Sequence, residues 1–379
     1  MAPKRKAETA AKPAESEEPP AKRGPGRPRV RPIVPEEKPA PVTHPSHGTV
    51  PGTIFVLGDA DCGQLGLGED VTEKLRPGPV QLPYGKKVRQ VAAGGMHSVA
   101  LAEDGSVWSW GVNDEGALGR ETGGEAWEKY HGRTGKVEDS YVPKPVAMPS
   151  EAGKVVQLSA GDSHTAALTE EGVVYAWGTF RSDAGVMGFS ESTRLQLVPV
   201  EVLHLRGNKD RVVKIASGAD HIVALTEKHR VWTWGSGLQG QLGRVGSRLC
   251  QRTMLHSLLT PTELRVPRWT VSAKSKPLDV DCGTYSTFLW TTDGKLDAWG
   301  LNNYGQLAHK DNVLWKPTQL KAFNETPVAW AKGGQHHSLV CLKDGKLMSM
   351  GRPTYGRLGR KDVNVSSDDP VPEVKQVEG

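Results

Sequence analysis

The amino-acid sequence predicts an all-β protein whose repeated units stack around an axis as a β-propeller, preceded by a disordered basic arm. Three observations support this prediction. A repeat of 51–66 residues begins near residue 52, each repeat contains hairpin patterns, and the N-terminal segment is rich in proline and charge. A unit of this size cannot bury both faces of its sheet alone, so radial stacking supplies the core.

The N-terminal arm, residues 1–48, differs in composition from the rest of the chain. It holds ten Lys and Arg against six Asp and Glu, and 11 of the chain's 27 prolines. With almost no large apolar residues, it cannot bury enough surface to offset the entropy lost on ordering, so we expect it to be disordered. Residues 49–379 are nearly neutral and form the predicted propeller.

Composition also excludes several classes of protein. No run of 18 apolar residues is present and the N-terminus lacks an apolar signal core, so we expect a soluble, unsecreted protein with no membrane partner. The four cysteines are far apart, which favours buried thiols over disulfides or zinc ligands. The sequence lacks a nucleotide-binding phosphate loop, a nucleophile elbow and a His-Glu-x-x-His motif, and we expect neither a cofactor nor a metal.

Two signatures define the repeat. The first places Gly before His and an apolar run, as in "GGMHSVAL" (94–101), "GDSHTAAL" (161–168), "GADHIVAL" (218–225) and "GGQHHSLV" (333–340). The second is a Gly-rich turn, as in "WGVNDEGALG" (110–119), with a stretched copy at 177–188. Between the signatures, runs such as "TAALTEEGVVYAWG" (165–178) alternate with period two around an Asp-Gly or Glu-Gly turn, which predicts β-hairpins.

The repeated histidines have a metal-binding and an architectural interpretation. We predict that His97, His164, His221 and His336 occupy equivalent places in successive units, and that Ser286 replaces the histidine in another unit. The rotation from one blade to the next keeps such positions apart, so they cannot converge on one ion. The pattern therefore favours architecture.

These signatures, with "GVNDEGALGR" (111–120) and "FRSDAGV" (180–186), resemble the repeats of the regulator of chromosome condensation family, which are seven-bladed propellers. The resemblance covers roughly residues 52–372. About five complete repeats and part of a sixth are present, so we expect a sequence truncated at its C-terminus rather than a new five-bladed closure. The alternative, an open ring, would leave an unpaired sheet edge.

In this family one face of the propeller grips the small GTPase Ran and expels its nucleotide. The resemblance implies the same exchange function here, through a ring of residues just before each repeated histidine: Asp61, Asp162, Asp220, Asn303 and His336. For any one of them, a turn residue that satisfies local backbone donors is the alternative.

The stretched repeat supplies a second implied contact. "TFRSDAGVM" (179–187) resembles the family's β-wedge, a hairpin pressed against the GTPase beside its phosphate loop. The implied contact residues are Phe180, Arg181, Ser182, Asp183, Ala184, Gly185 and Val186. An ordinary length-variable loop is the alternative.

Basic segments point to chromatin. "KRGPGRPRVRP" (22–32) resembles an AT-hook, with DNA contacts expected from Lys22, Arg23, Arg27, Arg29 and Arg31. A nuclear-import signal that binds importin, or a general phosphate-binding arm, is the alternative. The start Met-Ala-Pro-Lys resembles family members methylated on the α-amine, here that of Ala2.

A basic insertion forms a further candidate. "GRVGSRLCQRTMLHSLLTP" (243–261) resembles the family's switchback loop, which implies that Arg252, with Arg248 beside it, contacts the acidic patch of the nucleosome. A solvated surface loop is the alternative.

The sequence thus favours a nuclear, chromatin-associated exchange factor for Ran that makes or breaks no covalent bond. A non-catalytic adaptor that binds chromatin through the same fold is the second hypothesis. The 11 tryptophans raise a third, a photoreceptor like the plant ultraviolet-B propeller. Most of them lie in Trp-Gly strand ends, and the Gly-Trp-Arg-His-Thr signature is absent, which argues against that class.

Overall fold

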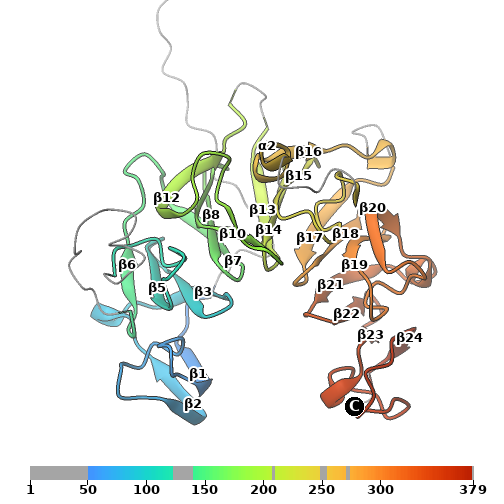
Figure 1. Cartoon of the computed structure of the whole chain (residues 1–379), viewed down its shortest axis with the longest axis horizontal. Helices are drawn as coiled ribbons and strands as arrows, with labels where there is room; N and C mark the ends of the chain where they lie inside the picture. Colours follow the sequence, from blue (N-terminus) through green and yellow to red (C-terminus); the bar gives the residue numbers. More distant parts are fainter. Residues whose placement is uncertain (1–49, 123–139, 207–209, 248–253, 270–273, 378–379) are drawn as a thin grey trace, which may run out of the picture. The chain divides into compact units, whose positions relative to one another are not determined.

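The computed structural model describes residues 50–122, 140–206, 210–247, 254–269 and 274–377. The chain divides into two units, Met1–Pro39 and Ala40–Gly379, and every described residue belongs to the second. Ala2 and the basic residues of the arm therefore lie outside the described residues. The strands follow one another in chain order through the second unit (Figure 1).

Five four-stranded antiparallel sheets make up most of the described chain. Sheet 1 contains β3 (Val88–Ala93), β4 (His97–Ala102), β5 (Val107–Gly111) and β6 (Lys144–Val146). Sheet 2 contains β7 (Val155–Ala160), β8 (His164–Thr169), β9 (Val174–Gly178) and β12 (Gln196–Leu203). Sheet 3 contains β13 (Val212–Ser217), β14 (His221–Thr226), β15 (Val231–Gly235) and β16 (Thr262–Leu264). Sheet 4 contains β17 (Pro277–Cys282), β18 (Ser286–Thr291), β19 (Leu296–Leu301) and β20 (Val313–Gln319). Sheet 5 contains β21 (Val328–Gly333), β22 (His337–Leu342), β23 (Leu347–Gly351) and β24 (Val371–Gln376).

Two hairpins and several short helices complete the described elements. β1 (Ile54–Asp59) pairs with β2 (Glu73–Val80), and β10 (Phe180–Ser182) with β11 (Gly185–Gly188). The helices are α2 (Leu255–Leu259) and the 3-10 turns η1 (Pro83–Gly85), η4 (Pro267–Trp269), η5 (Lys321–Phe323) and η6 (Thr354–Gly356). Within the described ranges, no helix is long and apolar enough to cross a membrane. The repeated sheets confirm the all-β fold class, while the blade number of a closed ring stays a prediction.

The predicted Asp-Gly and Glu-Gly turns join the second and third strands of sheets 1, 2, 4 and 5. Gly105 and Gly172 have φ of 88° and 81°, a region that glycine enters without steric cost. In sheet 3 the same position is His229, at φ 61°. Its Nδ1 lies 2.7 Å from the carbonyl oxygen of Pro277 in sheet 4, so this turn also contacts the next sheet.

Three Gly-rich turns of the second signature receive a tryptophan from the following sheet. The buried Trp177 of sheet 2 donates its Nε1–H to the carbonyl oxygen of Ala117 in the turn after β5, at 2.8 Å. A Cβ on Gly119 would lie only 2.6 Å from the same nitrogen, so glycine is needed there. The same bond joins Trp110 to Gln64 and Trp299 to Gln241.

The repeated histidine makes a second link between sheets. His97 Nε2 lies 2.9 Å from Thr165 Oγ1 in the second strand of sheet 2, and His221 is bonded in the same way to Thr287 in sheet 4. A Cβ on Gly94 would lie 2.2 Å from His97 Cε1, which explains why glycine precedes the histidine by three positions. The histidines thus join successive sheets, as the architectural interpretation requires.

One detail of the predicted register is wrong, at the histidine of sheet 5. In sheet 1, Gly94 donates the turn-closing amide hydrogen bond to the carbonyl oxygen of His97, at 2.8 Å. His337, not His336, begins β22 and pairs with the glycine that ends β23, as His97 pairs with the glycine ending β5. His336 instead occupies the turn position before the repeated histidine.

His164, at the interface of sheets 2 and 3, lacks the hydrogen bond that its counterparts make. Ile222 stands where the other two interfaces have threonine, and neither ring nitrogen of His164 has a hydrogen-bond partner. Burial lowers the pKa of His164 to about 3 and that of His97 to about 4, so both rings are neutral at physiological pH.

The first strands of neighbouring sheets are also bridged by side chains. Gln90 forms two hydrogen bonds of 2.8 Å with the backbone N–H and C=O of Leu158, and Gln157 does the same with Ile215 at 2.9 Å. Later interfaces use ion pairs instead, Lys214 with Asp279 at 3.5 Å and Lys332 with Asp281 at 2.9 Å.

Candidate functional site

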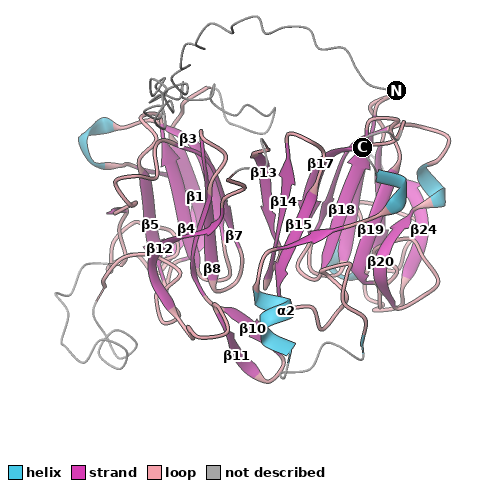
Figure 2. Cartoon of the chain, turned by 90° about the horizontal axis from the view of Figure 1, so that it is seen from above, coloured by secondary structure: helices cyan, strands magenta, loops and turns pink. Residues whose placement is uncertain are grey.

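One end of the sheets carries both kinds of repeated turn. Backbone hydrogen bonds join the turn before each second strand to the residue that follows the third strand. Val112 N donates to Met96 O, and Thr179 N donates to Ser163 O, both at 2.9 Å. The hairpin β10–β11, residues 180–188, projects from this end beside α2 (Figure 2). We call this hairpin the wedge hairpin, this end the wedge end, and the opposite one the far end.

The wedge hairpin is seated by apolar packing. Phe180 was expected to contact the GTPase, but it is only 1% exposed and belongs to the base of the hairpin. Its ring centroid lies 4.9 Å from that of His164 and 6.3 Å from that of Phe189. Leu258 and Leu259 of α2 belong to the same buried cluster. Aromatic burial of this size stabilises the base, while the tip residues Asp183 and Ala184 are exposed.

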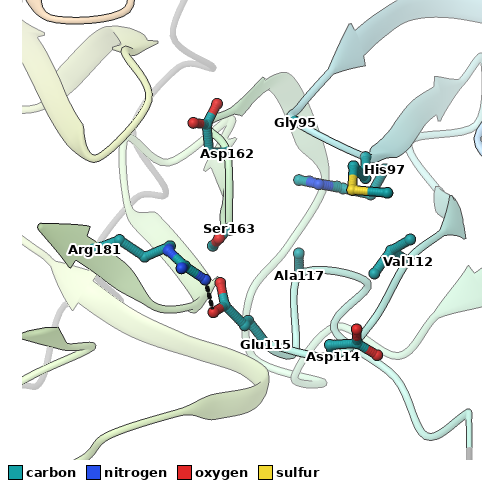
Figure 3. Close-up of a pocket in the computed structure, with 10 residues that line it drawn as sticks. Gly95, His97, Val112, Asp114, Glu115, Ala117, Asp162, Ser163 and Arg181 are labelled. Carbon is teal, nitrogen blue, oxygen red and sulfur yellow. Dashed lines mark hydrogen bonds and ion pairs between the residues drawn. The ribbon is translucent and has the colours of Figure 1, made fainter. Parts of the chain in front are cut away.

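Arg181 joins the wedge hairpin to the sheets on both sides. Its guanidinium forms an ion pair with Glu115, from the turn after β5 of sheet 1 (Figure 3). Its backbone N–H donates to Asp220 Oδ1, from the turn before β14 of sheet 3, at 2.7 Å. The direction of the hairpin is therefore set by two carboxylates that the chain supplies from different repeats.

A pocket of about 340 Å³ opens beside this ion pair. Asp162 and Ser163 line it from sheet 2, and the turns of sheet 1 line the other side (Figure 3). The remaining lining residues are Gly95, Met96, His97, Val112, Asp114, Glu115, Ala117 and Arg181. The pocket thus combines acidic groups with an apolar wall, which suits a protein contact better than bond-making chemistry.

The carboxylates at the wedge end are partly desolvated. Burial raises the pKa of Asp220 to about 7; the hydrogen bond from the Arg181 N–H acts in the opposite direction. Burial also raises the pKa of Asp162, against the nearby charge of Arg181. A cationic partner would favour the ionised form of both groups, and at Asp220 its binding would release a proton near neutral pH.

The predicted ring residues come from two kinds of turn, not one. Asp162, Asp220 and His336 precede the second strands of their sheets, whereas Asp61 and Asn303 follow β1 and β19, so the prediction that all five stand just before a repeated histidine is wrong. Asp61 and Asn303 are exposed. The carboxylates of Asp162 and Asp220 lie close enough to influence each other's titration.

The turns that carry these residues are joined to each other by their backbones. Asp162 N donates to Ala219 O at 2.8 Å, and Ala219 N donates to Thr284 O at 2.9 Å. Successive turns at the wedge end are therefore held in a fixed order.

Sequence reasoning missed Glu115. It lies in the same Gly-rich turn type as Asp61 and Asn303, which was the available signal, but its partner Arg181 is 66 residues away in the chain. Arg248 and Arg252 fall outside the described residues. Within the described ranges, no three His, Cys, Asp or Glu side chains gather as a metal site.

Comparison with known proteins identifies relatives along most of the chain. Residues 53–379 match the family described as the RCC1-like domain. The chain is 43% identical over 337 residues to the "Regulator of chromosome condensation" of Xenopus laevis, covering 87% of this chain and 74% of that protein. It is 34% identical over 348 residues to the "Guanine nucleotide exchange factor SRM1" of Saccharomyces cerevisiae, covering 85% and 68%.

Solved structures of yeast Prp20 have the same fold. One, described with the binding properties of Prp20p to Gsp1p and histones, matches with a TM-score of 0.71 and 32% identity, over 87% of this chain and 75% of Prp20p. The other, of Kap60 bound to yeast Prp20, gives the same TM-score and identity over 92% and 80%. The same fold thus occurs in a yeast protein that is described with its binding to Gsp1p and histones and that is also solved with Kap60 bound.

Proposed function

This chain belongs to the RCC1-like family of regulators of chromosome condensation, and from that premise we propose that it is a guanine nucleotide exchange factor for the small GTPase Ran, acting on chromatin. One observation carries the proposal. Arg181 of the wedge hairpin is held by Glu115 and Asp220 from the two flanking sheets, so a rigid projection stands beside an acidic surface. Relatives named as exchange factors support the same function.

The proposed mechanism needs no covalent step and no cofactor of this chain. GTPases of this class hold their nucleotide with backbone amides, a lysine and Mg²⁺ around the phosphates. A partner that binds the nucleotide-free loop better than the nucleotide-bound loop weakens nucleotide binding by the same coupling free energy. We assign that role to the wedge hairpin, whose apolar seat at Phe180 lets the tip press on the GTPase without yielding.

The contact residues are assigned by position at the wedge end. Asp162 and Asp220 would meet cationic groups of Ran beside the wedge hairpin, and Asp61, Asn303 and His336 would extend the contact across other sheets. Within the hairpin, Arg181 to Val186 would supply the pressing surface. Glu115 is a positioning residue, because it acts through Arg181.

Chromatin attachment would come from basic segments. Arg248 and Arg252 would bind the acidic patch of the nucleosome, and the arm residues between Lys22 and Arg31 would bind DNA or importin. The names of the relatives and the histone and Kap60 descriptions of Prp20 favour a nuclear protein of this kind. Methylation of the Ala2 amine would add a fixed positive charge to the arm.

Release of a fluorescent GDP analogue from purified Ran tests the proposal directly. The full chain at catalytic amounts should accelerate release, and Asp162→Ala and Asp220→Ala should each slow it about tenfold or more. Glu103→Ala is the matched control, since Glu103 is an exposed carboxylate at the far end. Nucleosome binding should be unchanged in all three variants. A folded chain that binds nucleosomes but gives no acceleration would support the non-catalytic adaptor instead.

A further inference from the structure

A second charged surface lies at the wedge end, on sheets 4 and 5. Tyr304 follows β19, His336 precedes β22, and Arg352, Tyr355 and Arg357 follow β23. We call these five residues the arginine–tyrosine patch. Its aromatic and cationic character contrasts with the acidic pocket lined by Asp162.

The patch is already ordered without a partner. Arg352 makes two hydrogen bonds to the carboxylate of Asp368, at 2.7 and 2.6 Å, and its guanidinium carbon lies 5.1 Å from the centroid of the Tyr304 ring. Tyr304 in turn packs against His336 at 4.7 Å between ring centroids. A surface held in one arrangement loses little entropy when it binds.

Arg357 has no ion-pair partner among the described residues, although its charge helps to lower the pKa of the nearby Asp368 carboxyl. Its Nε donates to the carbonyl oxygen of Thr354 at 2.7 Å, and its guanidinium carbon lies 5.6 Å from the centroid of the Tyr355 ring. Arg352, in contrast, is paired with Asp368. Burial lowers the pKa of His336, and the charges of Arg352 and Arg357 lower it further, whereas the Asp368 carboxylate acts in the opposite direction.

Tyr355 is an exposed aromatic on a strained backbone. It is 87% exposed and has φ of 62°, a conformation unfavourable for a bulky residue. Nothing in its own fold requires the ring, because the contact with Arg357 is at the surface. Tyrosine and arginine are the residues that most often dominate binding energy at protein interfaces.

We propose that the arginine–tyrosine patch binds an acidic segment of the GTPase and thereby fixes the orientation of the GTPase on the wedge end. The inference rests on the proposed exchange function and adds a second contact chemistry to it. A partner would place cationic groups on Asp162 and Asp220 and carboxylates on Arg357, with Tyr355 packed against the stem of the acidic segment. Reversing the partner would set like charges against each other at both places, which is unfavourable.

The chain offers a matched control for Tyr355. Tyr84 has φ of 63° and is 95% exposed in a similar Pro-Tyr-Gly turn, but it precedes β3 and so lies at the far end. Changing either tyrosine to glycine removes the ring and relieves the same backbone conformation. Neither variant should melt at a lower temperature than the wild type.

Exchange kinetics with Ran loaded with fluorescent GDP separate the possibilities. Tyr355→Gly and Arg357→Gln should each raise KM for Ran about tenfold with kcat little changed, while Tyr84→Gly leaves both unchanged. The effect of Arg357→Gln should shrink as salt rises from 0.05 to 0.5 M, because screening weakens a contact between opposite charges.

Other outcomes overturn the inference in distinguishable ways. If the wild type accelerates release and both patch variants behave like it, only this inference fails. A wild type without any acceleration removes the proposed function as well. Normal exchange together with weaker nucleosome binding by Arg357→Gln would assign the patch to nucleic-acid phosphates and reject the GTPase contact.

Discussion

Sheet 2 is joined to its two neighbours in different ways. Toward sheet 1 it receives the His97–Thr165 hydrogen bond, and Thr165 also donates to the carbonyl oxygen of Ala117 at 2.9 Å. Toward sheet 3 it offers His164, which meets Ile222 and makes no hydrogen bond. The glutamine bridges are the same at both interfaces. One interface therefore uses polar contacts where the other uses apolar packing.

The difference shows how the wedge hairpin is seated. Phe180 packs on His164, so the seat belongs to the interface that lacks the polar link. The His97 imidazole is held by its hydrogen bond to Thr165, whereas the unbonded His164 ring lies against Phe180 with the two ring planes inclined by 47°. Apolar packing thus replaces one hydrogen bond at the place where the chain leaves the sheet to form the projection.

Lowering the pH should have the largest effect on the free energy of unfolding, and it acts on both interfaces. The buried His97, His164 and His221 have lowered pKa values in the folded state, so the unfolded chain binds more protons below pH 6.5 and stability falls as pH falls. Each histidine should cost about 2 kcal/mol between pH 6.5 and pH 5. Asp220, with its pKa raised to about 7, acts in the opposite direction and offsets about one of them.

Urea unfolding at pH 7 and pH 5 measures this loss, which should be about 4 kcal/mol. As the pH is lowered, imidazole proton shifts followed by NMR should show that His97 is protonated before His164, because His97 has the higher pKa. Equal stability at the two pH values would contradict the conclusion that these histidine rings are buried and neutral in the folded chain.

Adding one methyl group to the glycine before each histidine should distinguish the interfaces. A Cβ on Gly94 or Gly161 would lie 2.2 or 2.1 Å from the histidine ring, so either change displaces the ring, and Gly161→Ala should cost about 3 kcal/mol. Gly94→Ala should cost about 1 kcal/mol more, since the displaced His97 also loses its bond to Thr165. Gly246→Ala, where a Cβ meets nothing within 4 Å, is the control.

Thr165→Val should make the polar interface resemble the apolar one. The change keeps the side-chain shape, removes the acceptor for His97 and the donor to Ala117, and should cost about 2 kcal/mol in urea unfolding. A cost below about 0.5 kcal/mol would mean that the histidine–threonine bond does little for stability.

Ile222→Thr should have the smallest net effect. It offers His164 the partner that His97 has, but loses apolar burial, so stability should change by less than about 1 kcal/mol. The informative readout is the His164 ring N–H, which should become visible and protected by NMR. No new protected ring proton would mean that the ring stays turned toward Phe180.

The sequence predicted the elements better than their partners. Alternation around Asp-Gly turns located the hairpins, and the stretched repeat located the wedge hairpin within one residue. The local pattern could not choose between the paired glycines of "GGMH" or the paired histidines of "GGQHH", because only strand register decides. The Glu115–Arg181 pair and the His97–Thr165 bond join residues 66 and 68 positions apart, which no single repeat reveals.

The histidine and tryptophan links carry a consequence for how such a chain lengthens during evolution. Between sheets 1 and 2, for example, His97 is received by Thr165, and Trp177 is received by the glycine-rich turn after β5. Each interface needs side chains from two neighbouring repeats, so duplicating one repeat copies only one side of each of its two interfaces. The copy packs well only if the repeats on both sides of it carry the complementary residues. A copied repeat must therefore match its neighbours at both joints, and at the joint with Ile222 the matching group is Phe180 of the wedge hairpin, which packs on His164.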